Sequence, residues 1–376
     1  MPPISVLIKP ASSLCNLRCE YCFYHAIADS RSVPSYGIMQ DSVLEQIIMK
    51  VLQFADGVAT FSFQGGEPTL CGLDFFRRVI ELQEKYNVKK VQVSNCLQTN
   101  GTLLDEEWAS FLHDHRFLVG LSLDGPAAVH DRYRLDPDGT GTYDRVIKAA
   151  AMLEKHEVEY NILLVVNGTN AKKPQRLYQF FRDHGFRYLQ FIPCIDPKGV
   201  PRGSLPFSLD NERFAGFLKG FFDKWYAEIS RDEEVSVRYF DNLVRIAMGM
   251  RPETCSMFGT CQCQFVFEAD GSVYPCDFYV NDEWRIGRIH DLTIEQIAMS
   301  ETALRFMKQS IGVPEECARC EWYRLCKNGC RRDREDNVED DLGVNCYCSA
   351  YREFFEYAFP RIQALARHFS GVPVRT

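Results

Sequence analysis

Cysteine is the residue type that most constrains this chain, because sixteen cysteines occur among its 376 residues. Ten of them lie between Cys255 and Cys348. The first residues contain no basic segment followed by a long apolar core, which a secretory signal would need, so a cytoplasmic location is expected. In a reducing cytoplasm, a high cysteine content favours metal or redox chemistry over disulfides. The cysteines are therefore the first candidates for function.

Composition argues against two classes of partner. The net charge is −8 and the basic residues are scattered, whereas nucleic acid binding needs a concentrated basic footprint. No uninterrupted apolar run approaches the length of a membrane span. A hydrophobic fraction of 46% and a charged fraction of 25% are ordinary for a globular protein. We expect neither nucleic acid nor membrane as a partner.

Short β-rich runs alternate with amphipathic stretches in the first half of the chain. Strands are predicted at residues 4–9, 59–63, 91–97, 118–123, 160–166 and 188–193, and helices at 41–55, 75–86, 142–156 and 175–184. In the first of these helices apolar residues recur at helical spacing. Six strand–helix repeats predict an α/β fold with a parallel sheet, either curved into a partial barrel or open. Functional residues of such folds gather after the strands' carboxyl ends.

The second half of the chain has a different character. A loop is expected at 196–212, a helix at 214–229, a cysteine-rich region from about residue 251, and a final helix at 349–368. We predict two domains, 1–235 and 236–376, the smaller one held together by metal rather than by a large core.

Three cysteines follow the first predicted strand with the spacing C-x3-C-x2-C: Cys15, Cys19 and Cys22. Three thiolates on one loop can hold three irons of a [4Fe–4S] cluster and leave the fourth open. An open coordination position is typical of a catalytic metal site. The alternatives are a three-ligand zinc site and three incidental thiols, although zinc loops more often use C-x2-C pairs.

A second motif, Gln64-Gly65-Gly66-Glu67-Pro68, follows the second predicted strand. Its two glycines let the backbone approach a ligand closely, and Glu67 can accept hydrogen bonds from an ammonium group. Taken alone, the same residues could form a simple turn.

The triad, with Tyr21 before its last cysteine, resembles the signature of the radical S-adenosylmethionine (SAM) superfamily. The resemblance implies a partial (β/α)6 barrel whose open iron chelates the amino and carboxylate groups of SAM. Reductive cleavage of SAM then yields a 5′-deoxyadenosyl radical, the cofactor supplying the difficult chemistry. The implied cofactor contacts are Gly65, Gly66 and Glu67 at the ammonium group, Tyr21 and Ile195 at the adenine, Ser122 at the ribose or carboxylate, and Arg134 at the carboxylate.

The cysteine-rich region contains enough thiols for two further four-cysteine clusters. They are Cys317, Cys320, Cys326, Cys330 and Cys348, with Cys255, Cys261, Cys263 and Cys276 upstream. A pair of structural zinc sites is the alternative, because C-x2-C spacing supports both.

This region resembles the SPASM domain of radical enzymes that act on peptides, and the whole chain resembles the anaerobic sulfatase-maturating enzymes. The matching segments are residues 8–13, 64–70, 97–101 and 274–279. The resemblance implies three [4Fe–4S] clusters in all. The first auxiliary cluster would use Cys255, Cys261, Cys276 and Cys330, and the second Cys317, Cys320, Cys326 and Cys348. Cys263 or Cys346 could replace a named ligand, while Cys71, Cys96 and Cys194 read as core thiols.

The resemblance also implies a reaction, the oxidation of a cysteine or serine in a sulfatase polypeptide to Cα-formylglycine. The target would lie in a Cys/Ser-x-Pro/Ala-x-Arg segment, and ferredoxin or flavodoxin would donate electrons. Asp277 is the candidate base, because a negatively charged cluster beside it would make its carboxylate hold a proton more tightly; a loop-capping aspartate is the alternative. Tyr24, Gln64 and Gln98 are candidate substrate contacts.

Two other functions compete with this one. A peptide maturase of the same architecture would form thioether or carbon–carbon links, but such enzymes often carry an extra N-terminal domain, and here the triad begins at residue 15. A non-enzymatic iron–sulfur or zinc protein would need neither the open-iron triad nor the double-glycine turn.

Overall fold

The computed structural model describes residues 3–197, 200–231, 233–336 and 342–370. They form two compact units, each discontinuous in sequence. The first unit comprises Met1–Leu123, His130–Asn161 and Gln262–Met307, and the second comprises Asp124–Val129, Ile162–Cys261 and Lys308–Thr376. The division after residue 235 remains a prediction.

A parallel sheet forms the centre of the first unit. Its strands β1 (Ile4–Ile8), β2 (Val58–Phe63), β3 (Gln92–Thr99) and β4 (Leu118–Ser122) pair in that order. On its other edge, β1 pairs in parallel with β8 (Val266–Phe267), which continues into the antiparallel strands β9 (Ser272–Tyr274) and β10 (Gly287–Arg288). Part of the cysteine-rich region thus extends the sheet that begins with β1.

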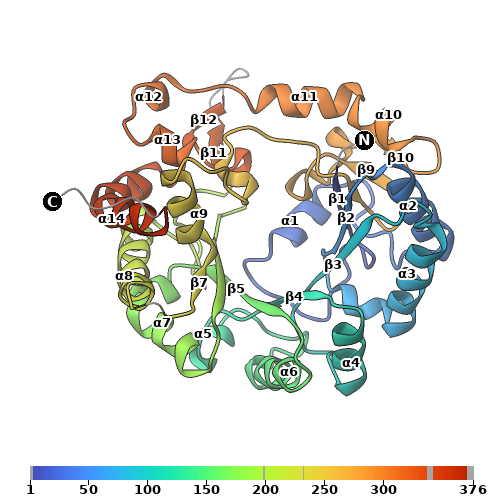
Figure 1. Cartoon of the computed structure of the whole chain (residues 1–376), viewed down its shortest axis with the longest axis horizontal. Coiled ribbons are helices and arrows are strands. Elements are labelled where there is room, and N and C mark those ends of the chain that lie inside the picture. The colour runs from blue at the N-terminus through green and yellow to red at the C-terminus, as the bar shows by residue number, and fades with distance from the viewer. Residues whose placement is uncertain (1–2, 198–199, 232, 337–341, 371–376) are drawn as a thin grey trace. The chain divides into compact units, whose positions relative to one another are not determined.

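The helices of this unit are α1 (Phe23–Asp29), α2 (Asp41–Phe54), α3 (Leu73–Tyr86), α4 (Glu106–Asp114), α6 (Tyr143–Lys155), α10 (Ile294–Ala298) and most of α11 (Glu301–Gln309). Figure 1 shows α2 and α3 on one side of β1–β3 and α1 on the other. Helix α2 buries the six apolar residues whose spacing predicted it: Val43, Leu44, Ile47, Ile48, Val51 and Leu52.

The second unit contains the parallel strands β5 (Tyr160–Val166, whose first two residues belong to the first unit), β6 (Tyr188–Pro193) and β7 (Ser236–Val237). Its longer helices are α7 (Pro174–Asp183), α8 (Asn211–Ile229), α9 (Arg238–Ala247) and α14 (Cys348–Phe369), with the short α12 (Glu315–Ala318), α13 (Tyr323–Cys326) and the hairpin β11 (Arg334–Asp336)–β12 (Leu342–Asn345). The helix α5 (Ala127–His130) follows β4 in the chain. Helix α14 packs on α8 and α9 through Phe354, whose ring lies 5.6 Å from Phe222 and 5.7 Å from Phe240.

The α/β class and the six predicted strands are confirmed. The helix predicted at 214–229 begins earlier, at Asn211, because the carboxylate of Asp210 accepts a hydrogen bond from the Arg213 amide at 2.7 Å and caps it. Strand β7 and helix α9 were not predicted. In the part of the chain that the structure describes, no helix has both the length and the apolar character to cross a membrane.

Candidate functional site

The cysteine triad lies on the loop between β1 and α1, as predicted. The Cys22 amide donates to the Cys19 carbonyl at 3.0 Å, and the Leu17 amide lies 3.4 Å from the sulfur of Cys15. Burial, with smaller contributions from the charges of Glu67 and Cys22, raises the pKa of the Cys15 thiol to about 11. A bound metal replaces the thiol proton, so a raised thiol pKa does not prevent metal binding. Three soft thiolate donors on one loop fit an iron–sulfur cluster.

Glu67 is almost fully buried beside this loop. One carboxylate oxygen accepts hydrogen bonds from the hydroxyls of Thr69 and Thr99, both at 2.7 Å, and from the Thr69 amide. The other accepts the Asn100 amide at 2.8 Å. Burial raises the pKa of Glu67, while these hydrogen bonds lower it. The carboxylate therefore has a fixed orientation.

The two glycines before Glu67 are required by the chain itself. Gly66 has a φ of +55°, and a Cβ there would lie 2.1 Å from the carbonyl oxygen of Leu14. Gly65 has a φ of +101°, and its Cβ would lie 2.7 Å from the Lys9 ammonium. Both positions thus favour glycine, and Gly66 lets this turn approach the residue that precedes the triad.

Asp277 is the centre of a buried polar cluster in the first unit. One oxygen accepts hydrogen bonds from the Tyr24 hydroxyl at 2.5 Å and the Gln64 amide at 3.0 Å, and the other lies 3.4 Å from the ammonium of Lys9. Gln64 also donates to the Tyr24 hydroxyl at 2.7 Å. Burial and then the Asp277 charge raise the pKa of Tyr24 well above its ordinary value, so Tyr24 stays a hydrogen-bond donor.

Three residues predicted from different motifs therefore meet here, and a fourth was missed. Lys9 is buried and its ammonium also lies 4.1 Å from the centre of the Tyr24 ring. The available signal was a lysine directly after the apolar first strand. Gln98 lies half-buried on β3.

The predicted SAM contacts lie in both units. In the first, the Arg134 guanidinium is buried and lies 5.6 Å from the ring of Tyr21, and Ser122 is buried at the end of β4. Ile195 belongs to the second unit and is half-buried after β6.

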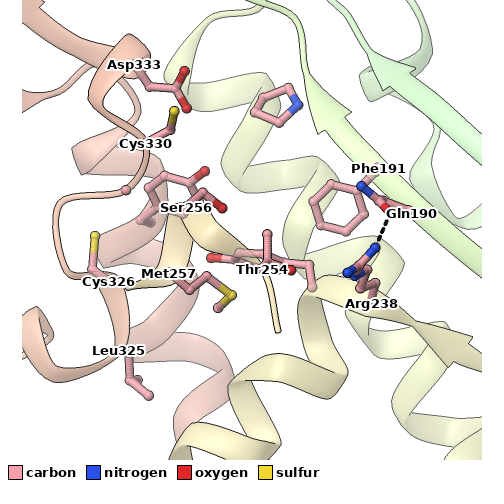
Figure 2. Close-up of a pocket in the computed structure, with 14 residues that line it drawn as sticks. Gln190, Phe191, Arg238, Thr254, Ser256, Met257, Leu325, Cys326, Cys330 and Asp333 are labelled. Atoms are coloured by element: carbon pink, nitrogen blue, oxygen red, sulfur yellow. Dashed lines mark hydrogen bonds between the residues drawn. The ribbon is translucent and has the colours of Figure 1, made fainter. Parts of the chain in front are cut away.

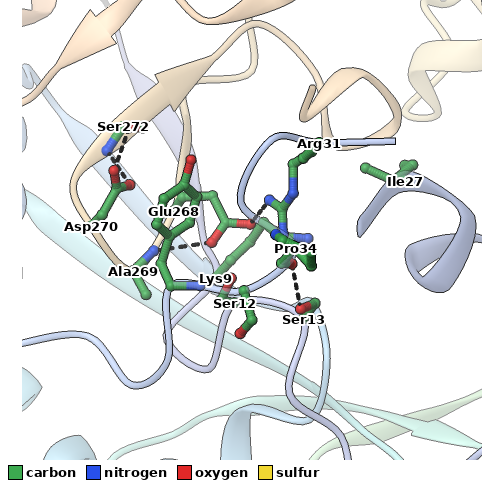
Figure 3. A network of polar contacts seen from close by, with 12 residues as sticks. Lys9, Ser12, Ser13, Ile27, Arg31, Pro34, Glu268, Ala269, Asp270 and Ser272 are labelled. Atoms are coloured by element: carbon green, nitrogen blue, oxygen red, sulfur yellow. Dashed lines mark hydrogen bonds and ion pairs between the residues drawn. The ribbon is translucent and has the colours of Figure 1, made fainter. Parts of the chain in front are cut away.

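An ion pair that was not predicted anchors the hairpin preceding Asp277 (Figure 3). Arg31, from the segment after α1, donates to Glu268 at 2.7 Å and to the Pro34 carbonyl at 2.5 Å. The side chains of Arg31 and Glu268 are 2% and 0% exposed. The hydroxyl of Ser13, two residues before the triad, donates to the same Pro34 carbonyl at 2.8 Å. One network thus links the β8–β9 hairpin to the start of the triad loop.

The four thiols predicted for the second auxiliary cluster belong to the second unit. Burial, together with the charges of Cys348, Cys317 and Cys320, raises the pKa of the Cys326 thiol to about 12. Electrostatic interaction among these thiols fits a four-thiolate cluster. No disulfide joins any of the sixteen cysteines.

The ligands predicted for the first auxiliary cluster are divided between the units: Cys276 belongs to the first, and Cys255, Cys261 and Cys330 to the second. The charges of Cys255 and Cys261 interact. Figure 2 shows a pocket of the second unit that is lined by Cys330 and Cys326, among others. The pocket's far wall contains Arg238, which donates to Gln190 at 3.0 Å.

The comparison with known proteins supports the same assignment. Residues 10–181 match the model of the radical SAM superfamily, and residues 255–321 match that of an iron–sulfur cluster-binding domain, SPASM. A cysteine-type anaerobic sulfatase-maturating enzyme of Clostridium perfringens is 50% identical over 98% of this chain and 100% of its own length. The chain therefore belongs to the anaerobic sulfatase-maturating enzymes.

A solved structure and a serine-type relative are also similar to this chain. A solved structure described as native anSMEcpe with bound AdoMet and Kp18Cys peptide matches with a TM-score of 0.94 and 49% identity, covering 98% of this chain and 100% of that one. A serine-type member from Bacteroides thetaiotaomicron is 32% identical over 95% of this chain and 90% of its own length. Full-length identity at this level favours sulfatase maturation over the crosslinking alternative.

Proposed function

We propose that this enzyme oxidises a cysteine of a sulfatase polypeptide to Cα-formylglycine, with Asp277 as the base. The observation that carries the assignment of the base is the convergence of Lys9, Tyr24 and Gln64 on one buried carboxylate, which directly follows the predicted cluster ligand Cys276. Such a constellation gives the carboxylate one fixed orientation, as a base in a transition state requires.

The cofactors would be SAM and three [4Fe–4S] clusters. Their proposed ligands are Cys15, Cys19 and Cys22 for the SAM cluster; Cys255, Cys261, Cys276 and Cys330 for the first auxiliary cluster; and Cys317, Cys320, Cys326 and Cys348 for the second. When bound, SAM and its cluster would supply a 5′-deoxyadenosyl radical, which removes a Cβ hydrogen. An auxiliary cluster would supply the acceptor for the second electron. Gly65, Gly66, Glu67, Tyr21, Ser122, Arg134 and Ile195 are proposed to hold SAM.

Residues of the chain itself would then remove the proton of the substrate thiol. The Tyr24 and Gln64 hydrogen bonds keep one oxygen of Asp277 oriented, and Lys9 balances the negative charge before the proton arrives. Asp277 is 5% exposed, so little water competes for it. Gln98 is proposed to contact the substrate from β3.

Cysteine is proposed as the target because the cysteine-type relatives of Clostridium are 50% and 44% identical, whereas the serine-type relative from Bacteroides is 32% identical. The target segment would be Cys-x-Pro-x-Arg or a close variant. We further propose a ferredoxin or flavodoxin as the electron donor, a cytoplasmic location, and a domain boundary after residue 235.

The test is anaerobic incubation of the reconstituted enzyme with SAM, dithionite and a peptide containing Cys-x-Pro-x-Arg, followed by mass spectrometry. The proposal predicts a product in which the target residue has lost sulfur and two hydrogens and gained oxygen, and which reacts with an aldehyde reagent. A matched serine peptide should react more slowly. A product of the cysteine peptide that has lost only two hydrogens, keeps its sulfur and does not react with an aldehyde reagent would instead identify a crosslinking enzyme.

A further inference from the structure

Arg334 is a buried arginine in the second unit that holds three separate segments. Its side chain donates to four backbone carbonyls: Asn328 at 3.2 Å, Ser310 at 2.9 Å, Gly259 at 3.0 Å and Gly329 at 3.2 Å. The residue is 4% exposed. Carbonyl oxygens carry no net charge, and an arginine does not lose its proton in proteins. The positive charge of Arg334 therefore remains inside the protein.

Two of these carbonyls belong to an unfavourable backbone segment. Lys327, Asn328 and Gly329 have φ values of +52°, +64° and +62°, so three consecutive residues adopt the left-handed conformation, which non-glycine residues disfavour. The segment joins Cys326, a proposed ligand of the second auxiliary cluster, to Cys330, a proposed ligand of the first. Arg334 thus stabilises the strained connection between the two ligand sets.

The other two carbonyls, those of Gly259 and Ser310, belong to or contact the loop that carries Cys261. Gly259 lies two residues before Cys261, and the Cys261 amide donates to the hydroxyl of Ser310 at 2.7 Å. The Ser310 carbonyl is bound by Arg334 in turn. Arg334 therefore holds the Cys261 loop in two ways: directly through the Gly259 carbonyl, and indirectly through Ser310, whose hydroxyl binds the Cys261 amide.

We propose that Arg334 is a positioning residue for the two auxiliary clusters, whose ligand loops it holds together and whose reduced forms its buried charge favours. This inference rests on the proposed ligand set of those clusters but not on the proposed reaction. A four-thiolate cluster gains negative charge when it takes up an electron, so a buried cation nearby stabilises the reduced form.

The test uses the full-length protein in which Cys15, Cys19 and Cys22 are replaced by alanine, so that only the auxiliary clusters are reconstituted. Arg334→Gln removes the charge, Arg334→Lys retains it with fewer donors, and Arg319→Gln is the control. Arg319 precedes the proposed ligand Cys320, but its side chain is 79% exposed, so its charge is screened by water. The readouts are the midpoint potentials from a reductive titration followed by electron paramagnetic resonance and the rate of iron loss to a chelator.

Arg334→Gln is expected to lower the auxiliary midpoint potentials and to speed iron loss, whereas Arg334→Lys is expected to speed iron loss at an unchanged potential. Arg319→Gln should match the parent in both readouts. An Arg334→Gln protein with both clusters at the parent's potentials would overturn the proposal. If Arg334→Gln does not fold, Arg334→Lys decides: iron loss no faster than in Arg319→Gln overturns it. Because no substrate is used, these results are independent of whether formylglycine is formed.

Discussion

Replacing Lys9 by methionine should expose how strongly the Asp277 cluster depends on its buried cation. The ammonium and the carboxylate lie 3.4 Å apart, with side chains 3% and 7% exposed. At an effective dielectric constant of about 20, their attraction is about 5 kcal/mol. Removing one partner of a buried pair typically costs about 3–5 kcal/mol, because it leaves the other charge unpaired.

The expected loss lies at the lower end of that range, about 3 kcal/mol, because the Tyr24 and Gln64 hydrogen bonds to Asp277 remain. If the unpaired carboxylate causes the loss, then Lys9→Met combined with Asp277→Asn should be more stable than Lys9→Met alone.

The assay is anaerobic urea denaturation of the parent, both single variants and the double variant at matched iron content. Lys85→Met is the control, because Lys85 pairs with Glu45 at 2.8 Å but its side chain is 56% exposed; little change is expected there. The reasoning would be refuted if Lys9→Met and the parent had the same denaturation midpoint. It would also be refuted if the double variant lost as much stability as the two single variants together.

Three further predictions follow from the geometry. Gly66→Ala should prevent the triad from holding its cluster, because the new Cβ would meet the Leu14 carbonyl at 2.1 Å; iron analysis would show loss of about one cluster's iron, and a full complement would contradict the prediction. Cys261→Ser should lower the auxiliary iron content and Cys263→Ser should not; the reverse result would exchange the two ligands. Burial raises the pKa of Asp241 to about 6. As the pH rises from about 4 to about 6, the unfolded state loses this proton before the folded state does, so the free energy of unfolding should fall by up to about 3 kcal/mol. Asp241→Asn should thus raise the denaturation midpoint more at about pH 7.5 than at about pH 4, and an equal effect at both would show that the carboxyl is not perturbed.

Much of the fold could be predicted because its local signals agree with the final structure. The apolar spacing in residues 41–55 predicted α2, and the same six residues are buried there. The start of α8 was predicted too late because its cap, Asp210, lay in a segment rich in proline, glycine and serine. The two-residue strand β7 is too short to leave a periodic pattern.

The candidate site was predictable in its members but not in its connections. Tyr24, Gln64 and Asp277 were each singled out, yet their meeting depends on the pairing of β1 with β8, two strands more than 250 residues apart in the chain. The same pairing brings Lys9 to Asp277, and no local pattern indicates it. Arg334 likewise binds carbonyls from three distant segments, which only the folded chain brings together. The double glycine was predicted for ligand approach, and in the folded chain it also lies against Lys9 and Leu14.

In the proposed reaction, Asp277 removes a proton from the substrate but is not needed to generate the radical. Asp277→Asn tests this claim most directly. The measurement is the amount of 5′-deoxyadenosine and of formylglycine peptide formed in one anaerobic reaction with SAM, dithionite and the cysteine peptide. Asp282→Asn, an exposed aspartate five residues away, is the matched control. The account predicts that Asp277→Asn still forms 5′-deoxyadenosine but yields little formylglycine, while the control yields both. Equal formylglycine yields from the two variants would contradict it.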